Sequence, residues 1–273
     1  MKKIVVPIDF SEQSDYALKV AASLAKTHNT EILALHMLEL NQAMITSSEG
    51  FHPEQTVFLI KLAEKRFKDF LNKPYLKGIK VTPIVKHFKV FSEVNDVAKK
   101  VDADMIIMGS HGTDGLKEIF VGSNAERVVR NADIPVLIIK KNHEDFKIDR
   151  FLFACAFKEE SLESFRKARN FAELLNAELK LVYVNTPGDE FLSSKDTNDR
   201  ISKFLDQAGV SMEVEVYNDY NIESGILNYS EIMSADIIGI PTHGRKGLSH
   251  FFMGSIGEDI ANHSTIPVVT FKI

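Results

Sequence analysis

The chain has 273 residues, which suits roughly two domains of about 100–150 residues each. With 44% hydrophobic and 26% charged residues its composition is that of an ordinary globular protein, and a net charge of −5 argues against a general affinity for nucleic acids or membrane surfaces. The single cysteine, Cys155, excludes an intrachain disulfide and fits a reducing compartment, so we expect a cytoplasmic location.

In the first half, short β-rich runs alternate with longer helical patterns. The basic, then apolar start of the chain resembles a signal peptide, but Pro7 and Asp9 interrupt its apolar run and favour a first strand. We expect Ser11 to cap the helix that follows. The other expected elements are strands at 31–37, 80–86, 105–108 and 136–140 and helices at 54–71, 93–101 and 123–130. In the second helix we expect four side chains to face inward: Val57, Leu62, Phe67 and Phe70.

The second half repeats this order after a polar, aperiodic segment at 141–150 that is typical of a linker. We expect strands at 151–157, 179–184, 212–217, 237–240 and 268–272. We expect helices at 162–175, 199–208, 223–233 and after Gly254. The second copy is shorter because it has no counterpart of segment 41–53, which we interpret as a surface loop rather than a lid.

Apolar runs that alternate with helices indicate a parallel sheet with right-handed crossovers. The predicted fold class is therefore α/β: two tandem copies of an open five-stranded parallel sheet with helices on both faces, Rossmann-like, with strand order 3-2-1-4-5. The predicted domains span residues 1–141 and 150–273. In such a sheet a ligand binds at the carboxyl ends of the strands, here between the first and the fourth.

A glycine loop follows the fourth strand in both copies. Gly109-Ser110-His111-Gly112 opens it, and Gly122-Ser123 closes it nine residues later. At an offset of 132 residues, Pro241-Thr242-His243-Gly244 and Gly254-Ser255 repeat the pattern. Glycine lets a backbone approach a phosphate closely, and a helix N-terminus adds free N–H donors. The loop therefore predicts a phosphate site, and the alternative is that its glycines serve the turn alone.

Together with Asp9 at the end of the first strand, this loop resembles the motif of universal stress proteins. Members of that family that bind ATP carry G-2x-G-9x-G-[S/T] after the fourth strand and an aspartate after the first. The resemblance covers both halves of the chain. It implies two adenine nucleotide alpha hydrolase-like domains and a pseudo-dimer, formed within one chain, that pairs through the fifth strands. Two such chains could pair further as a homodimer.

The resemblance also implies roles for particular residues. Asp9 would contact the adenosine end of the ligand, Met37 would lie near adenine and Gly109 by the ribose. The phosphates, with or without Mg²⁺, would be held by four residues: Gly112, Gly122, Ser123 and Asn124. Two alternatives stay open. Asp9 could serve only the first turn of its helix, and Met37 could be an ordinary core residue.

The second copy departs from the motif at two positions. Ala156 stands in place of the aspartate, and Pro241 in place of the first glycine. Proline fixes φ and removes an N–H where the backbone should approach the ligand. We therefore expect adenine nucleotide binding in the first copy only, although an anion site could persist in the second beside Arg245 and Lys246.

The sequence favours a sensor or regulatory binding protein over an enzyme. It contains no nucleophile elbow and no Walker loop, and its scattered histidines lack the paired spacing of a metal site. Cys155 lies in an apolar run, which predicts an inert buried thiol. Two other hypotheses are a slow ATPase or adenylyl-transferring enzyme, and a scaffold without a nucleotide.

Overall fold

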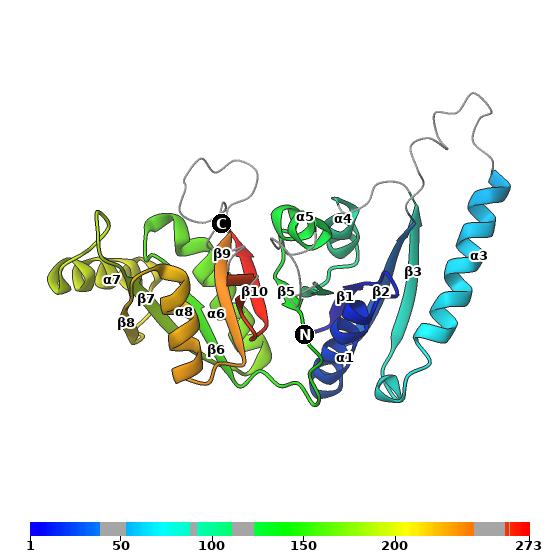
Figure 1. Cartoon of the computed structure of the whole chain (residues 1–273), viewed down its shortest axis with the longest axis horizontal. Coiled ribbons are helices and arrows are strands. Elements are labelled where there is room, and N and C mark those ends of the chain that lie inside the picture. The colour runs from blue at the N-terminus through cyan, green and yellow to red at the C-terminus, as the bar shows by residue number, and fades with distance from the viewer. Residues whose placement is uncertain (39–52, 88–91, 111–122, 243–259, 262) are drawn as a thin grey trace, which may run out of the picture. The chain divides into compact units, whose positions relative to one another are not determined.

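The computed structural model describes residues 1–38, 53–87, 92–110, 123–242, 260–261 and 263–273 (Figure 1). The chain divides into two compact units. One comprises Met1–Ser110 and Ile139–Phe146, and the other comprises His111–Ile138 and Lys147–Ile273. This division places most of the fifth predicted strand with the second unit. The predicted domain ranges, 1–141 and 150–273, stay predictions.

The first unit is built on a parallel sheet whose described strands run in the order β3-β2-β1-β4. In register, Pro7 lies beside Leu35, and Val5 lies beside Ile106. The apolar residues 4–6 in the middle of β1 are 0% exposed, as expected of a strand covered on both faces. The strands are β1 (Lys3–Pro7), β2 (Glu31–Leu38), β3 (Val81–His87) and β4 (Met105–Gly109).

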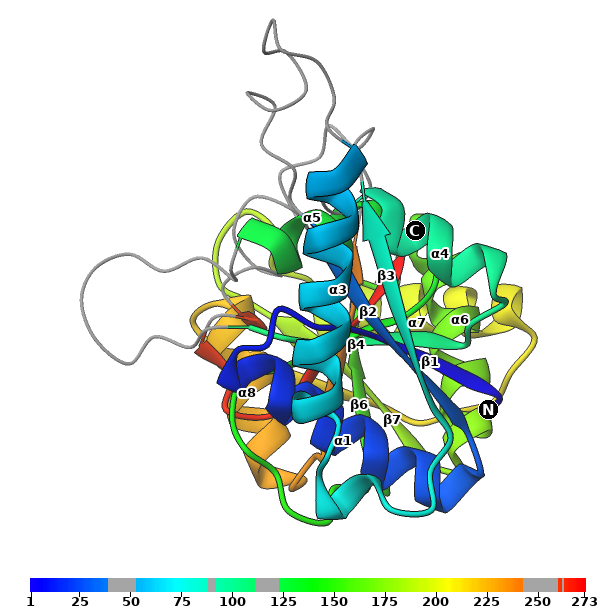
Figure 2. The same ribbon diagram turned by 90° about the vertical axis from the view of Figure 1, so that its right-hand side faces the viewer.

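Helices connect these strands, as the sequence predicts. The Ser11 side chain accepts a hydrogen bond from the Ser14 amide and caps the first helix, which ends at a left-handed Asn29. The helices are α1 (Glu12–His28), α3 (Pro53–Phe70), the short 3₁₀ helix η1 (Pro74–Leu76) and α4 (Ser92–Lys100). In Figure 2, which faces this unit, α3 runs alongside β3.

The prediction of which side chains of α3 face inward is partly wrong. Val57 and Leu62 were expected inside, but they are 50% and 45% exposed, and Phe58 is 66% exposed. Phe67, near the end of the helix, is buried as expected. The helix therefore packs against the sheet through its C-terminal half, and an apolar face at its N-terminal half lies open.

In the second unit the described strands run in the order β5-β10-β9-β6-β7-β8. Each pair of neighbouring strands in this order is parallel except β5 and β10. These two strands pair antiparallel, with Leu137 opposite Val269. Within the second copy the order is the predicted 3-2-1-4-5. The strands are β5 (Val136–Ile139), β6 (Arg150–Ala154), β7 (Glu178–Asn185), β8 (Val214–Asn218), β9 (Ile237–Thr242) and β10 (Val268–Lys272).

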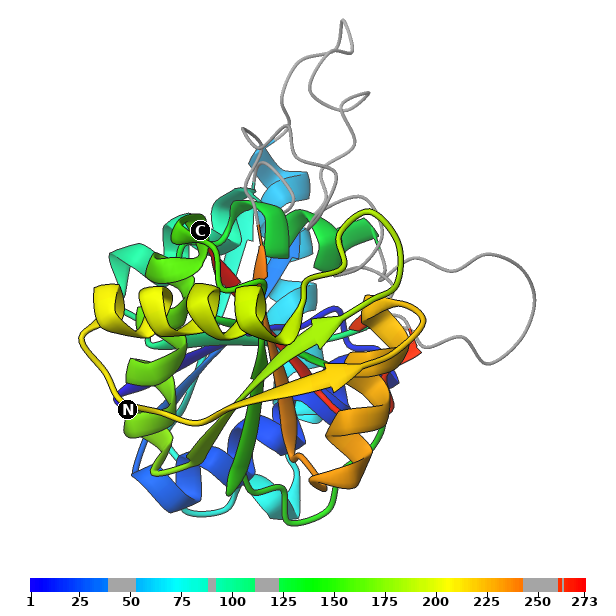
Figure 3. The ribbon, with the colours of Figure 1, turned by 90° about the vertical axis from the view of Figure 1, so that its left-hand side faces the viewer.

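The helices of this unit are α5 (Ser123–Asn131), η2 (Glu159–Ser161), α6 (Leu162–Leu175), α7 (Ser194–Ala208) and α8 (Ile222–Ile232). In Figure 3, α7 (yellow) lies in front of the strands and α8 (orange) to their right. We expected helix α7 to begin at residue 199, but it begins at Ser194. Ser193 caps it there by accepting a hydrogen bond from the Asp196 amide. The helix predicted after Gly254 begins outside the described residues.

The second sheet carries a core on each face, which confirms helices on both sides. Phe151 of β6 stacks with Phe271 of β10, and Phe153 meets the same ring edge-on. Both also contact α6, Phe151 through Phe171 and Phe153 through Phe165. The alternate residues of β6 belong to an aliphatic cluster on the other face that includes Ile226 of α8. The chain therefore has the predicted α/β fold, with buried parallel strands as its core.

In the part of the chain that the structure describes, no helix combines the length and the apolar character needed to cross a membrane.

Candidate functional site

Three of the predicted site residues meet at one edge of the first unit's sheet. Asp9 follows β1, Met37 is near the end of β2, and Gly109 ends β4. The Ile8 amide still donates to the Leu35 carbonyl oxygen at 2.8 Å, so β1 and β2 stay paired up to Asp9. Because these neighbouring strands are parallel, their carboxyl ends lie together, where open α/β sheets bind ligands.

Asp9 holds the start of α1 and stays ionised. Its Oδ1 accepts hydrogen bonds from the hydroxyl of Ser11 and from the Ser11 amide, the latter at 2.9 Å. Burial raises the pKa of Asp9, but the hydrogen bonds from Ser11 and Ser14 outweigh this effect and hold the pKa below its usual value. Since the residue is also exposed, its carboxylate is both fixed in place and accessible to a ligand.

An aromatic cluster that the sequence did not predict lies beside Asp9. Phe10 has a φ of +66°, a left-handed conformation that costs a non-glycine residue about 1–2 kcal/mol. Its ring centroid lies 4.6 Å from that of His36 and 5.2 Å from that of Phe67. The guanidinium carbon of Arg66 lies 4.2 Å above the same ring. Burial of the ring and a cation–π contact therefore offset the backbone strain.

His36 ties this cluster to the end of β1. Its Nδ1 lies 2.7 Å from the Ile8 carbonyl oxygen, to which it must donate because a carbonyl oxygen can only accept. Burial, chiefly, lowers the pKa of His36, so the ring is neutral at pH 7. One signal in the sequence could have revealed the cluster, because the second copy also has a phenylalanine, Phe157, at the position equivalent to Phe10. In the structure the φ of Phe157 is also positive, at +51°.

Met37 lies at the rim of the sheet and not in the core. It is partly exposed, whereas Leu35, two residues earlier in β2, is fully buried. Its neighbour in β3 is Lys86, an exposed residue. This position is compatible with the predicted role beside a ligand.

Gly109 has a structural role that the sequence did not predict. A Cβ at this position would lie 2.2 Å from the Gln13 carbonyl oxygen, in the first turn of α1. Glycine is therefore required for α1 to approach β4, whether or not a ligand binds. In the second copy, where Pro241 takes this place, Glu160 stands at the position of Gln13 and belongs to the separate turn η2.

The other predicted residues of the glycine loop stay predictions. Gly112 and Gly122 lie outside the described residues. Ser123 begins α5, and Asn124 is exposed in its first turn. Both belong to the second unit. Among the described residues, no group of His, Cys, Asp and Glu side chains could hold a metal ion.

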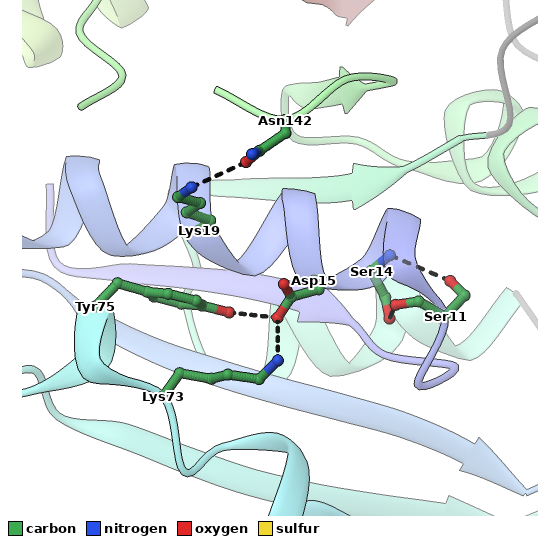
Figure 4. A network of polar contacts seen from close by, with 7 residues as sticks. All are labelled: Ser11, Ser14, Asp15, Lys19, Lys73, Tyr75 and Asn142. Atoms are coloured by element: carbon green, nitrogen blue, oxygen red, sulfur yellow. Dashed lines mark hydrogen bonds and ion pairs between the residues drawn. The ribbon is translucent and has the colours of Figure 1, made fainter. Parts of the chain in front are cut away.

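A polar brace holds α1 in position beneath the site (Figure 4). Asp15 of α1 accepts a hydrogen bond from the Tyr75 hydroxyl at 2.6 Å and pairs with Lys73 at 3.1 Å. Burial and this bond to Asp15 raise the pKa of Tyr75. On the same helix, Lys19 donates to Asn142 at 3.0 Å. These contacts fix the helix that Ser11 caps and whose first turn lies against Gly109.

Comparison with known proteins yields one consistent family. The model of the universal stress protein family matches residues 1–140 and 147–272. The chain is 33% identical over 140 residues to universal stress protein MJ0531 of Methanocaldococcus jannaschii, a match that covers 51% of this chain and 82% of that protein. It is 30% identical over 147 residues to universal stress protein YxiE of Bacillus subtilis, covering 50% of this chain and 98% of that one.

Among solved structures, a universal stress protein from Archaeoglobus fulgidus matches 99% of this chain and 96% of its own length, with a TM-score of 0.70 and 23% sequence identity. That similarity concerns the fold alone. With two matches of the family model that together span nearly the whole sequence, the chain belongs to the universal stress protein family.

Proposed function

We propose that this stress-response protein binds ATP, or another adenine nucleotide, in its first copy and acts as a sensor or regulatory module. The observation that carries the proposal is the convergence of Asp9, Met37 and Gly109 at the carboxyl ends of β1, β2 and β4. These are the three predicted site residues that belong to the nucleoside half of the motif.

The chemistry of this edge suits a nucleoside. The ionised carboxylate of Asp9 is an acceptor for ribose hydroxyl groups. The partly exposed Met37 offers apolar surface to a base. The phosphate half of the proposal rests on the sequence motif, with Gly112, Gly122, Ser123 and Asn124 as the donors, and with Mg²⁺ as an optional companion of the phosphates.

We further propose a cytoplasmic location and a pseudo-dimer of the two repeats. The antiparallel pairing of β5 with β10 supports the pseudo-dimer because these are the fifth strands of the two copies. An ion pair of 2.8 Å between Lys272 and Asp133, both in the second unit, lies next to the paired strands. A homodimer of two such chains is a further proposal that light scattering would test.

The experiment is a calorimetric titration of the nucleotide-stripped full-length protein with ATP, with and without Mg²⁺. We expect one site per chain. Asp9→Asn, which keeps the shape of the side chain and removes its charge, should weaken binding by about tenfold, a typical effect for a hydrogen bond to a charged group. Gly122→Val should weaken it by about tenfold or more, since the added side chain blocks close backbone approach.

Gly254→Val is the matched control because Gly254 is the counterpart of Gly122 in the second copy. It should leave the affinity unchanged. Two sites per chain would contradict nucleotide binding by the first copy alone. An absence of saturable binding would indicate a scaffold, and turnover of about 1–10³ per second would indicate an enzyme.

A further inference from the structure

The second unit has a cavity at the position that Asp9 and Met37 occupy in the first. It has a volume of about 40 Å³ and lies at the carboxyl ends of β6 and β7, between α7 and α8. Ala156, the counterpart of Asp9, and Val184, the counterpart of Met37, both line it. The cavity is therefore the second copy's version of the same sheet edge, built from different side chains.

Most of the cavity wall is apolar. Ala154 and Ala156 line it from β6 and the turn after it, Val182 and Val184 from β7, and Ile226 from α8. Ile226 and Val182 are almost fully buried, at 2% and 0% exposed. Binding sites for drug-sized ligands commonly have about 300–1,000 Å³, so this cavity is too small for a nucleoside but suits a group of a few heavy atoms.

The polar part of the wall carries more positive than negative charge. Arg200 of α7 and Lys158 line the cavity, together with one carboxylate, Glu190. Within the described residues, Arg200 forms no hydrogen bond or ion pair, not even with Glu190. It is only partly exposed, and its charge acts on the hydroxyl of the buried Tyr183, which also lines the cavity. A guanidinium in this setting favours an anion and matches a carboxylate in shape.

We infer that the second unit binds a small organic carboxylate, with its carboxylate group on Arg200 and its short hydrocarbon part on Val182, Val184 and Ile226. Each part of the ligand has a matching surface in the cavity. Ala156 also matters, because an aspartate at this position would repel the anion and fill the space. This inference does not rest on nucleotide binding by the first copy.

The test is a titration of the methyl-labelled full-length protein with sodium isobutyrate, followed by NMR. The methyl signals of Ile226 and Val184 should shift saturably, with an affinity in the millimolar range that is usual for so small a ligand. Isobutyramide has the same shape without the charge and should bind at least about tenfold more weakly, because it loses the charge-assisted bonds. Repeating the titration with saturating ATP should give the same result.

Two variants assign the site. Arg200→Gln should weaken isobutyrate binding by about tenfold. Lys203→Gln removes one positive charge from an exposed position of the same helix and should have no effect. The methyl spectrum of each variant shows directly whether it is folded. Val184→Phe, which fills the cavity, should abolish the shifts of Ile226.

Four results would overturn the inference: no saturable shift with isobutyrate, equal binding of isobutyramide, no effect of Arg200→Gln in a folded protein, or inorganic phosphate binding more tightly than isobutyrate. The last result would make the cavity a general anion site.

Discussion

Replacing Gly109 by alanine would place a carbon atom where the backbone of α1 already lies. The added Cβ would be 2.2 Å from the Gln13 carbonyl oxygen and 2.4 Å from its carbonyl carbon. Both are backbone atoms, which cannot rotate away as the end of a side chain can, so α1 and β4 must move apart. Overpacking of a well-packed core typically costs about 1–3 kcal/mol, and we expect about 3 kcal/mol here.

Hydrogen exchange measured by mass spectrometry can assign this loss to one unit. Peptides from β1, α1 and β4 that exchange through unfolding of the first unit should do so about a hundredfold faster in Gly109→Ala. Peptides from β6 and β7 should exchange as in the wild type. Gly209→Ala is the control: φ there is +68°, but nothing lies within 4 Å of an added Cβ, so about 1 kcal/mol of backbone strain in the second unit is expected.

The result that would refute this reasoning is wild-type exchange in Gly109→Ala together with weaker ATP binding. Gly109 would then serve the ligand, as the family resemblance implies, and not the packing of α1. Loss of both stability and binding would agree with the structural role, because Asp9 and Ser11 belong to the turn that leads into the displaced helix.

Three further predictions concern single side chains. Tyr75→Phe removes the hydroxyl that donates to Asp15 and should destabilise the first unit by about 1–2 kcal/mol in urea unfolding; an unchanged midpoint would show that the brace contributes nothing. Because burial lowers the pKa of His36, the unfolded chain binds a proton more readily, so stability should fall as the pH drops below about 6.5. His36→Phe should reduce that pH dependence, and an unaltered slope would contradict the assignment. Burial raises the pKa of Cys155 to about 12, so thiol reagents should label it only as fast as the second unit opens; rapid labelling of the native protein would disprove its burial.

The sequence predicted those features that local chemistry determines. The cap at Ser11 follows from the residue type alone, and the bounds of α6, Leu162–Leu175, follow from an apolar period with a strand on either side. The strand order of the second copy was predictable because buried parallel strands leave few allowed connections. The same pattern gave the location of Asp9 at the end of β1.

Features that depend on distant residues were not predictable. The apolar residues of α3 have a helical spacing, but Val57 and Leu62 stay exposed because the helix packs only where it contacts Phe10 and the sheet. Nothing in the sequence near Gly109 indicates that Gln13, almost a hundred residues away, fills the space for its side chain. The cavity of the second unit likewise depends on Arg200 of α7, which belongs to no motif.

The two copies separate what the fold needs from what a ligand needs. Phe10 and Phe157 both adopt the left-handed conformation after the first strand of their copy. Each places its ring centroid 5.2 Å from a phenylalanine of the second long helix, Phe67 or Phe204. In both copies a bulky residue therefore adopts a conformation that costs about 1–2 kcal/mol. This indicates a requirement of the turn and not of a ligand, because the preceding residue is an aspartate in one copy and an alanine in the other.

The residue immediately before the phenylalanine differs between the two copies. The first copy has a carboxylate, Asp9, fixed by Ser11, whereas the second has a methyl group, Ala156, facing a small cavity. Both copies keep the left-handed phenylalanine, so the exchange of Asp9 for Ala156 changes the chemistry of the sheet edge while this feature of the turn is kept. The two proposals therefore assign hydroxyl groups to the sheet edge beside Asp9 and a small anion to the sheet edge beside Ala156, and residues 9 and 156 are where that difference begins.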